Sequence, residues 1–68
     1  MLTSLYTADI KINPTDKDYH RYLIVMSDSE GVLIVNRGLF VLSFETVNDF
    51  INSDLEVKDK RYIGDINL

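Results

Sequence analysis

Carboxylate and amide side chains are the most chemically capable groups in this sequence. Four carboxylates and two amides lie between residues 38 and 57, where no lysine or arginine occurs. Such side chains accept hydrogen bonds from Arg and Lys, so an exposed set of them can bind a basic protein surface. The alternative is a solvated acidic surface without a partner. The residues predicted to form the partner-binding surface are Glu45, Asn48, Asp49, Asn52, Asp54 and Glu56.

Residues for nucleophilic or acid–base catalysis are scarce. His20 is the only histidine, cysteine is absent, and no Gly-x-Ser-x-Gly segment occurs. A catalytic histidine needs a nucleophile or a carboxylate within hydrogen-bond reach, and His20 is more typical of a half-exposed strand position. We therefore expect a protein that is not an enzyme and has no catalytic residues.

Two acidic segments, 16–18 and 28–31, could be taken for metal-binding loops. Neither has the alternating oxygen ligands, the glycine at the sixth position and the closing glutamate of a calcium loop. Gly31 and Gly38 are not followed by the Lys and Ser or Thr of a phosphate-binding loop. Acidic residues and glycine also build turns, so the sequence predicts no metal and no cofactor.

The overall charge argues against nucleic acid and membrane partners. Eleven acidic and seven basic residues give a net charge of −4, which disfavours binding to a phosphate backbone. The aromatic and basic cluster at 19–22 has its two tyrosines on opposite sides of a strand. Apolar runs such as 23–26 are far below the ~20 residues of a membrane span, and no basic region precedes an apolar stretch near the N-terminus. We expect a cytoplasmic protein without direct contact to nucleic acid or membrane.

The elements that must position these residues are mostly strands of a single domain, 1–68. Alternation over 2–12 predicts a strand with one buried face, and the polar segment 13–18 is a loop because Pro14 cannot lie in a central strand. Both sides of 19–27 are apolar, which is typical of a central strand covered on both faces. After a turn at 28–31, strand composition resumes at 32–35 and 39–42, and again from residue 55 onward.

Gly38 leaves two structures open. It can close a tight hairpin between 32–35 and 39–42, through a type I turn and a bulge, or it can be a bulge in one long strand. The hairpin is the slightly better interpretation.

An amphipathic helix is predicted from Phe44 to about Ser53. Ser43 is a suitable N-cap, and an apolar stripe of Phe44, Val47, Phe50 and Ile51 would pack on the sheet. In such a helix Glu45 and Asp49 are like charges at i and i+4, which disfavours the helix slightly and suggests that this surface is shaped for a partner.

The predicted fold class is α+β. It is a small two-layer domain with a mostly antiparallel sheet of four to five strands and one short helix, in the order β-β-β(-β)-α-β. The predicted core comprises Ile10, Ile12, Ile24, Val25, Ile34, Val41, Phe44, Val47, Phe50, Ile51 and Ile63.

Two classes of non-enzymatic function compete, with a small enzyme as a third. The leading hypothesis is a small acidic inhibitor or adaptor that binds a basic surface of a larger protein, such as a surface that normally holds nucleic acid. One alanine, seven isoleucines, five asparagines and eight aspartates fit a phage or mobile-element origin. The second is a homodimeric structural or assembly module, which would pair an exposed apolar sheet edge, 32–35 or 39–42, across a two-fold axis.

Overall fold

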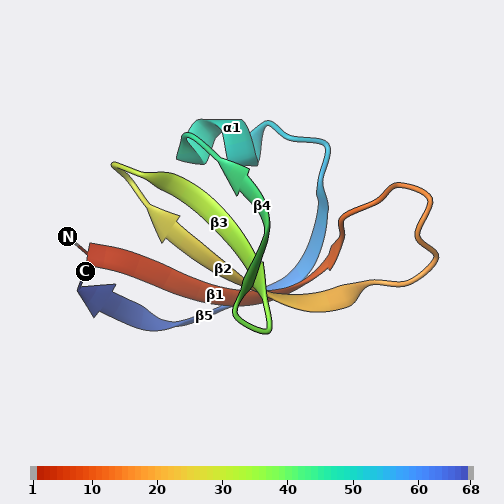
Figure 1. Ribbon diagram of the computed structural model, residues 1–68, viewed down its shortest axis with the longest axis horizontal. Coiled ribbons are helices and arrows are strands. Elements are labelled where there is room, and N and C mark those ends of the chain that lie inside the picture. The colour runs from red at the N-terminus through yellow and green to blue at the C-terminus, as the bar shows by residue number, and fades with distance from the viewer. Residues whose placement is uncertain (1, 68) are drawn as a thin grey trace.

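The computed structural model describes residues 2–67. These residues form five strands and one short helix, shown in Figure 1. The elements are β1 (Leu2–Lys11), β2 (His20–Ser27), β3 (Gly31–Asn36), β4 (Leu39–Phe44), α1 (Val47–Ile51) and β5 (Glu56–Asn67). The predicted strand and helix order is confirmed, but α1 is so short that the molecule is mostly sheet and the α+β description fits only loosely.

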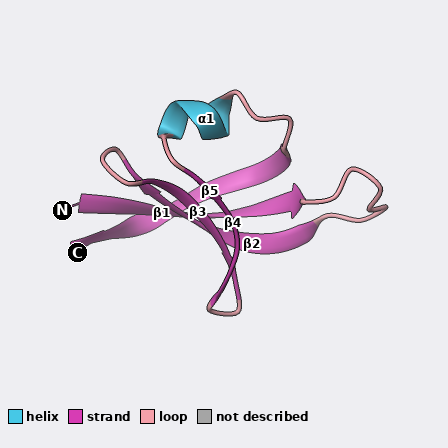
Figure 2. Cartoon of the chain, turned by 45° about the horizontal axis from the view of Figure 1, so that its top comes forward, coloured by secondary structure: helices cyan, strands magenta, loops and turns pink. Residues whose placement is uncertain are grey.

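All the strands pair antiparallel in the order β4-β3-β2-β1-β5. The first four follow one another as a meander. The chain then leaves β4 at one edge of the sheet, passes through α1, and returns as β5 on the opposite edge beside β1 (Figure 1). Figure 2 shows that α1 lies over one face of the sheet. The sheet therefore has two open edges, β4 and β5, and one face without a helix.

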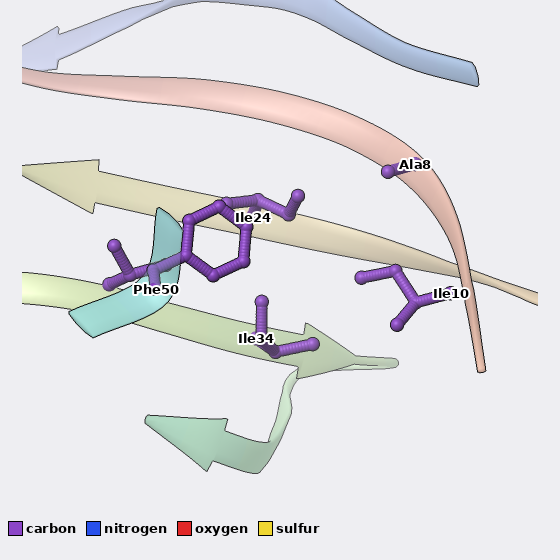
Figure 3. Close-up of a cluster of buried hydrophobic side chains, with 6 residues drawn as sticks. Ala8, Ile10, Ile24, Ile34 and Phe50 are labelled. Carbon is purple, nitrogen blue, oxygen red and sulfur yellow. The ribbon is translucent and has the colours of Figure 1, made fainter. Parts of the chain in front are cut away.

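The core lies between α1 and the sheet. Ile24 on β2 is directly opposite Ile34 on β3, and Phe50 of α1 lies over both (Figure 3). The ring of Phe50 also meets that of Phe44 edge-on, with 5.4 Å between the ring centres. The buried apolar residues are Ala8, Ile10, Ile24, Val32, Ile34 and Phe50.

The core prediction is partly confirmed. Of the predicted residues, four are buried, and Ile12, Phe44 and Val47 pack partly buried against them. Val41, Ile51 and Ile63 are exposed, so their assignment to the core was wrong. Val41 and Ile63 lie at the register shifts of their strands, where an extra residue breaks the alternation between faces.

The second strand is covered on one face only, contrary to the expectation that both faces are covered. Val25 is opposite Leu5 of β1 and Leu33 of β3, and all three point away from Ile24 and the helix. These side chains and Leu23 are half-buried by one another. Val25 therefore belongs to the open apolar face rather than to the predicted core.

Gly38 closes a tight hairpin between β3 and β4 and is not a bulge in one long strand. This confirms the hairpin interpretation. β3 and β4 pair directly on either side of Arg37 and Gly38. Both turn residues have positive φ, 54° and 79°, which is the backbone that suits a two-residue hairpin loop rather than the expected type I turn. A register shift in β4 opposite Ile34 and Val35 adds a bulge after the turn.

The helix begins three residues later than predicted. Phe44 is the last residue of β4 and is opposite Val32, so it reaches the core from a strand. Thr46, not Ser43, is the N-cap: its backbone is extended, and its hydroxyl oxygen accepts a hydrogen bond from the Asp49 N–H at 3.0 Å. Glu45 precedes the helix, so no helical i,i+4 repulsion links it to Asp49.

Candidate functional site

The predicted acidic and amide residues all lie on the segment that carries the chain from β4 through α1 to β5. Asn48 and Asp49 are in the first turn of α1, and Asn52 is its C-cap. All members of the set are solvent-exposed: Glu45, Asn48, Asp49, Asn52, Asp54 and Glu56. The predicted surface is therefore accessible. However, the helical i,i+4 repulsion between Glu45 and Asp49, which suggested a surface shaped for a partner, is absent.

Glu56 is engaged elsewhere. Its Oε2 accepts a hydrogen bond from the Tyr19 hydroxyl at 3.0 Å and lies 3.9 Å from Lys11 Nζ. Lys58 Nζ lies over the Tyr19 ring, 3.9 Å from its centre. The hydrogen bond to Glu56 is the main cause that raises the pKa of Tyr19 above its ordinary value, followed by burial and the carboxylate charge. Glu56 therefore stabilises the contact of β5 with the loop after β1 and is a poor member of a binding surface.

The remaining acidic residues lack such partners. In the part of the chain that the structure describes, no ion pair involves Glu45, Asp49 or Asp54. The pairs that do form join Asp9 to Arg21 and Glu56 to Lys11, both away from α1. The surface that could meet a basic partner reduces to these three carboxylates and the neighbouring amides of Asn48 and Asn52.

A second candidate surface is the edge strand β4. Leu39, Phe40 and Val41 follow one another and are 72%, 76% and 40% exposed, and the whole strand has no charged residue. Of the two apolar segments named for edge pairing, 39–42 lies on an edge, as expected. The other, 32–35, lies in β3 between β2 and β4, so its assignment to an edge was wrong.

The opposite edge, β5, has a different character. Half of its twelve residues are charged, two register shifts interrupt its pairing with β1, and Asp59 and Gly64 have positive φ. Charges and bulges on an edge strand oppose pairing with another chain. β4 has one register shift and no charged residue, so it is the edge that opposes extension by another strand less.

A hollow of about 330 Å³ between α1 and β5 is lined by apolar side chains and by Ser53, Lys58, Asp59 and Lys60. Its one hydroxyl, on Ser53, donates to the Phe50 carbonyl at 2.7 Å and so caps the end of the helix. His20 is exposed at the start of β2, opposite Ile10. Neither the Ser53 hydroxyl nor the His20 imidazole is paired as a nucleophile and a base would be.

Within residues 2–67, no three His, Asp or Glu side chains are grouped to hold a metal ion. No helix in the same residues has the length and apolar character to cross a membrane. Comparison with family models, with curated proteins and with solved structures gave no match to this chain.

Proposed function

We propose that this chain is a non-enzymatic protein-interaction module that binds its partner through the β4 edge. The observation that carries the proposal is an open edge strand without charge, on which Leu39, Phe40 and Val41 are exposed side by side. Exposed apolar edge strands in monomeric proteins are usually shortened, charged or covered, because they readily pair with other chains. β4 is short and has one register shift, but it carries no charge and its apolar residues are not covered. An interaction at this edge explains why these last two protections are missing.

The binding mode is addition of a strand to the sheet. The unpaired N–H and C=O groups of β4 supply the main-chain hydrogen bonds, and side chains on alternate faces supply specificity. Phe40 is opposite Val35, on the open face of the sheet, whereas Leu39 is opposite Asn36, on the face that carries α1. A strand bound to β4 would therefore contact an exposed apolar side chain on each face.

Affinity capture with two matched variants tests the proposal. Phe40→Lys places a charge on the β4 edge, and Ile63→Lys places the same charge on β5, where the side chain is 55% exposed. The captured partner is either another protein or a free copy of this chain. We expect the immobilised wild-type chain and Ile63→Lys to capture the same partner, and Phe40→Lys to lose it. Equal capture by the two variants would overturn the proposal.

A second proposal is that the acidic and amide residues bind a basic surface of a larger protein, in the manner of a phage or mobile-element inhibitor or adaptor acting in the cytoplasm. It is supported by the exposure of Glu45, Asp49 and Asp54 and by the absence of any base between residues 38 and 57. Such charges act mainly on the association rate and are screened over ~8–10 Å by salt.

The double variant Asp49→Lys, Asp54→Lys separates the two proposals. If the acidic surface binds the partner, the variant slows association and added salt slows that of the wild type, whereas Phe40→Lys binds normally. If the variant and the wild type associate equally fast, these residues are only a solvated surface.

A further inference from the structure

We propose that β4 binds β4 of a second copy of this chain, in antiparallel register across a two-fold axis, so that two sheets join into one. The inference rests on the proposed function of the β4 edge and names its partner. Four features of the described residues favour a second copy: the match of apolar side chains, the charges at the two ends of the strand, the protection of β5, and the small core.

The match of side chains follows from the register. If the axis passes between Val41 and Leu42, Leu39 of one copy is opposite Phe44 of the other. Both residues lie on the face that carries α1, because they are opposite Asn36 and Val32 of β3. The same register keeps both helices on one side of the joined sheet.

The same register aligns the open faces of the two copies. Phe40 is opposite Ser43 of the second copy, and both residues belong to the face without a helix, since they are opposite Val35 and Leu33 of β3. The half-buried apolar side chains of this face, which include Val25, then continue from one copy to the next. No charged side chain is opposite another along the strand.

The charges next to β4 fix the direction of pairing. Going outward from the strand, the first charged residue is Arg37 on one side and Glu45 on the other. Antiparallel pairing brings Arg37 of each copy beside Glu45 of the other, at both ends of the contact. Parallel pairing would instead bring Arg37 to Arg37 and Glu45 to Glu45, and like charges across strands are destabilising. The edge is therefore complementary to itself only in the antiparallel direction.

Pairing through β4 ends at two copies. A contact that uses the same strand on both sides is closed, because each copy has one β4. Growth into a filament would require β5 as well, and its six charges and two register shifts oppose that. The two edges together thus predict a dimer.

A small core means that the fold gains stability from burying more apolar surface in a dimer. The short edge limits how strong that contact can be. Six buried apolar residues support the fold, and a second copy shields Leu39, Phe40 and Val41 from water. Stable complexes bury ~1,200–2,000 Å² in total, and a strand of six residues falls toward the lower end of that range or below it. We expect dissociation on the order of micromolar or weaker, visible as a mass that rises with concentration.

Sedimentation equilibrium of charge-exchanged variants tests the inference. Arg37→Glu and Glu45→Arg each place like charges at both ends of their own dimer, and we expect each to weaken self-association roughly tenfold. In an equimolar mixture the hetero-pair has an acid beside a base at both ends again. The mixture should therefore associate within about threefold of the wild type.

A net-charge control accompanies the mixture. Arg37→Glu lowers the chain charge by two, from −4 to −6, and Lys17→Glu does the same in the exposed loop between β1 and β2. A mixture of Lys17→Glu with Glu45→Arg has equal net charges but keeps one like-charge end, so we expect it to associate more weakly than the mixture with Arg37→Glu.

Three results would overturn the inference: a wild-type chain that stays monomeric to about millimolar concentration, unchanged self-association of Arg37→Glu, or no recovery in the mixture with Glu45→Arg. None of these results decides the proposed function, which the capture experiment with Phe40→Lys tests separately. Loss of a different captured partner in that variant would show that β4 binds another protein instead. Because Arg37, Glu45 and Lys17 are exposed and outside the core, these variants test association rather than folding.

Discussion

The two edges of one sheet differ in almost every property that governs pairing. β4 is short and uncharged, with three consecutive exposed apolar residues. β5 is twice as long and half charged, and it is bent by two register shifts. A small sheet can thus leave one edge open to pairing while the other is protected, and association then stays limited.

The two edges are also held differently. β5 pairs with β1 over most of its length, from Glu56 opposite Lys11 to Asn67 opposite Leu2. β4 pairs only with β3, and on the core side it depends on α1, which packs on both strands. Changes in α1 should therefore reach β4 before they reach β5.

The largest expected effect comes from Phe50→Ala. Removing this ring, which packs on Phe44, Ile24 and Ile34, should lower the free energy of unfolding by about 3–5 kcal/mol. Urea denaturation measures the loss. Amide exchange should accelerate in β4 more than in β5.

Ile51→Ala is the matched control on the same helix. Ile51 is 67% exposed, so its loss should change the stability by less than about 0.5 kcal/mol. If Phe50→Ala unfolds at nearly the wild-type urea concentration, α1 does not support the β4 edge.

The sequence was sufficient for the strands and insufficient for the edges. Alternation and turn residues predicted β1, β2 and β5, because each of these strands either buries one face or pairs along the sheet. The register shifts at Val41 and Ile63 leave no mark in a hydrophobic pattern, so the pattern alone predicts these exposed bulge residues as core. An apolar residue at position 44 can pack on the core either from the first turn of a helix or from the end of a strand. The sequence pattern does not distinguish the two, and the structure shows the strand.

The candidate surfaces were predicted to a similar extent. Exposure of the acidic set followed from residue type, but the contact of Glu56 with Tyr19 joins residues 37 positions apart and could not be read from local spacing. That 39–42 is an edge whereas 32–35 is interior depends on strand order. Lack of charge does not distinguish the two strands, because β3 is as uncharged as β4.

The next expected effect comes from a pair of glycines near the two edges. A Cβ on Gly31 would collide with the backbone carbonyls of Phe44 and Glu45, and its φ is 88°. A Cβ on Gly64 in β5 meets open space, although its φ is 148°. We expect Gly31→Ala to cost more than about 2 kcal/mol and Gly64→Ala about 1 kcal/mol.

Urea denaturation of the two alanine variants gives the ranking. The expected order holds if the end of β4 packs closely on the start of β3 and Gly64 is limited only by its backbone. A larger loss in Gly64→Ala would mean that the backbone strain at Gly64 outweighs the collision at Gly31, and that the end of β4 does not pack closely on the start of β3.

A smaller effect is expected at the helix N-cap. Thr46→Ala removes the acceptor of the Asp49 N–H and should lower the stability by about 1 kcal/mol. Thr46→Ser keeps the hydroxyl and should stay close to the wild type. Because Thr46 sets where β4 gives way to α1, equal thermal stability of the two variants would show that packing alone positions this junction.

The smallest effect concerns alkaline pH, and it should involve β5 and the loop residue Tyr19 that contacts it, but not β4. Hydrogen bonds to Glu56 and Asp65 are the first causes that raise the pKa of Tyr19 and Tyr62 above the ordinary value, whereas β4 has no titratable side chain. A raised pKa in the folded state stabilises the fold below pH ~10, and this contribution is lost as the pH rises further.

Unfolding midpoints measured on either side of pH ~10 check this prediction. The Tyr19→Phe variant should show a flatter decline because it lacks one of the two groups. A decline that is as steep in this variant as in the wild type would assign the pH dependence to other residues.

Amide hydrogen exchange at two protein concentrations tests the central claim that β4 is the interacting edge and β5 the protected one. At the higher concentration, exchange within Leu39–Phe44 should slow, because a second copy pairs with the free groups of that strand. Exchange within Glu56–Asn67 should stay the same. Exchange in β4 that does not depend on concentration, or slowing in β5 instead, would contradict the account.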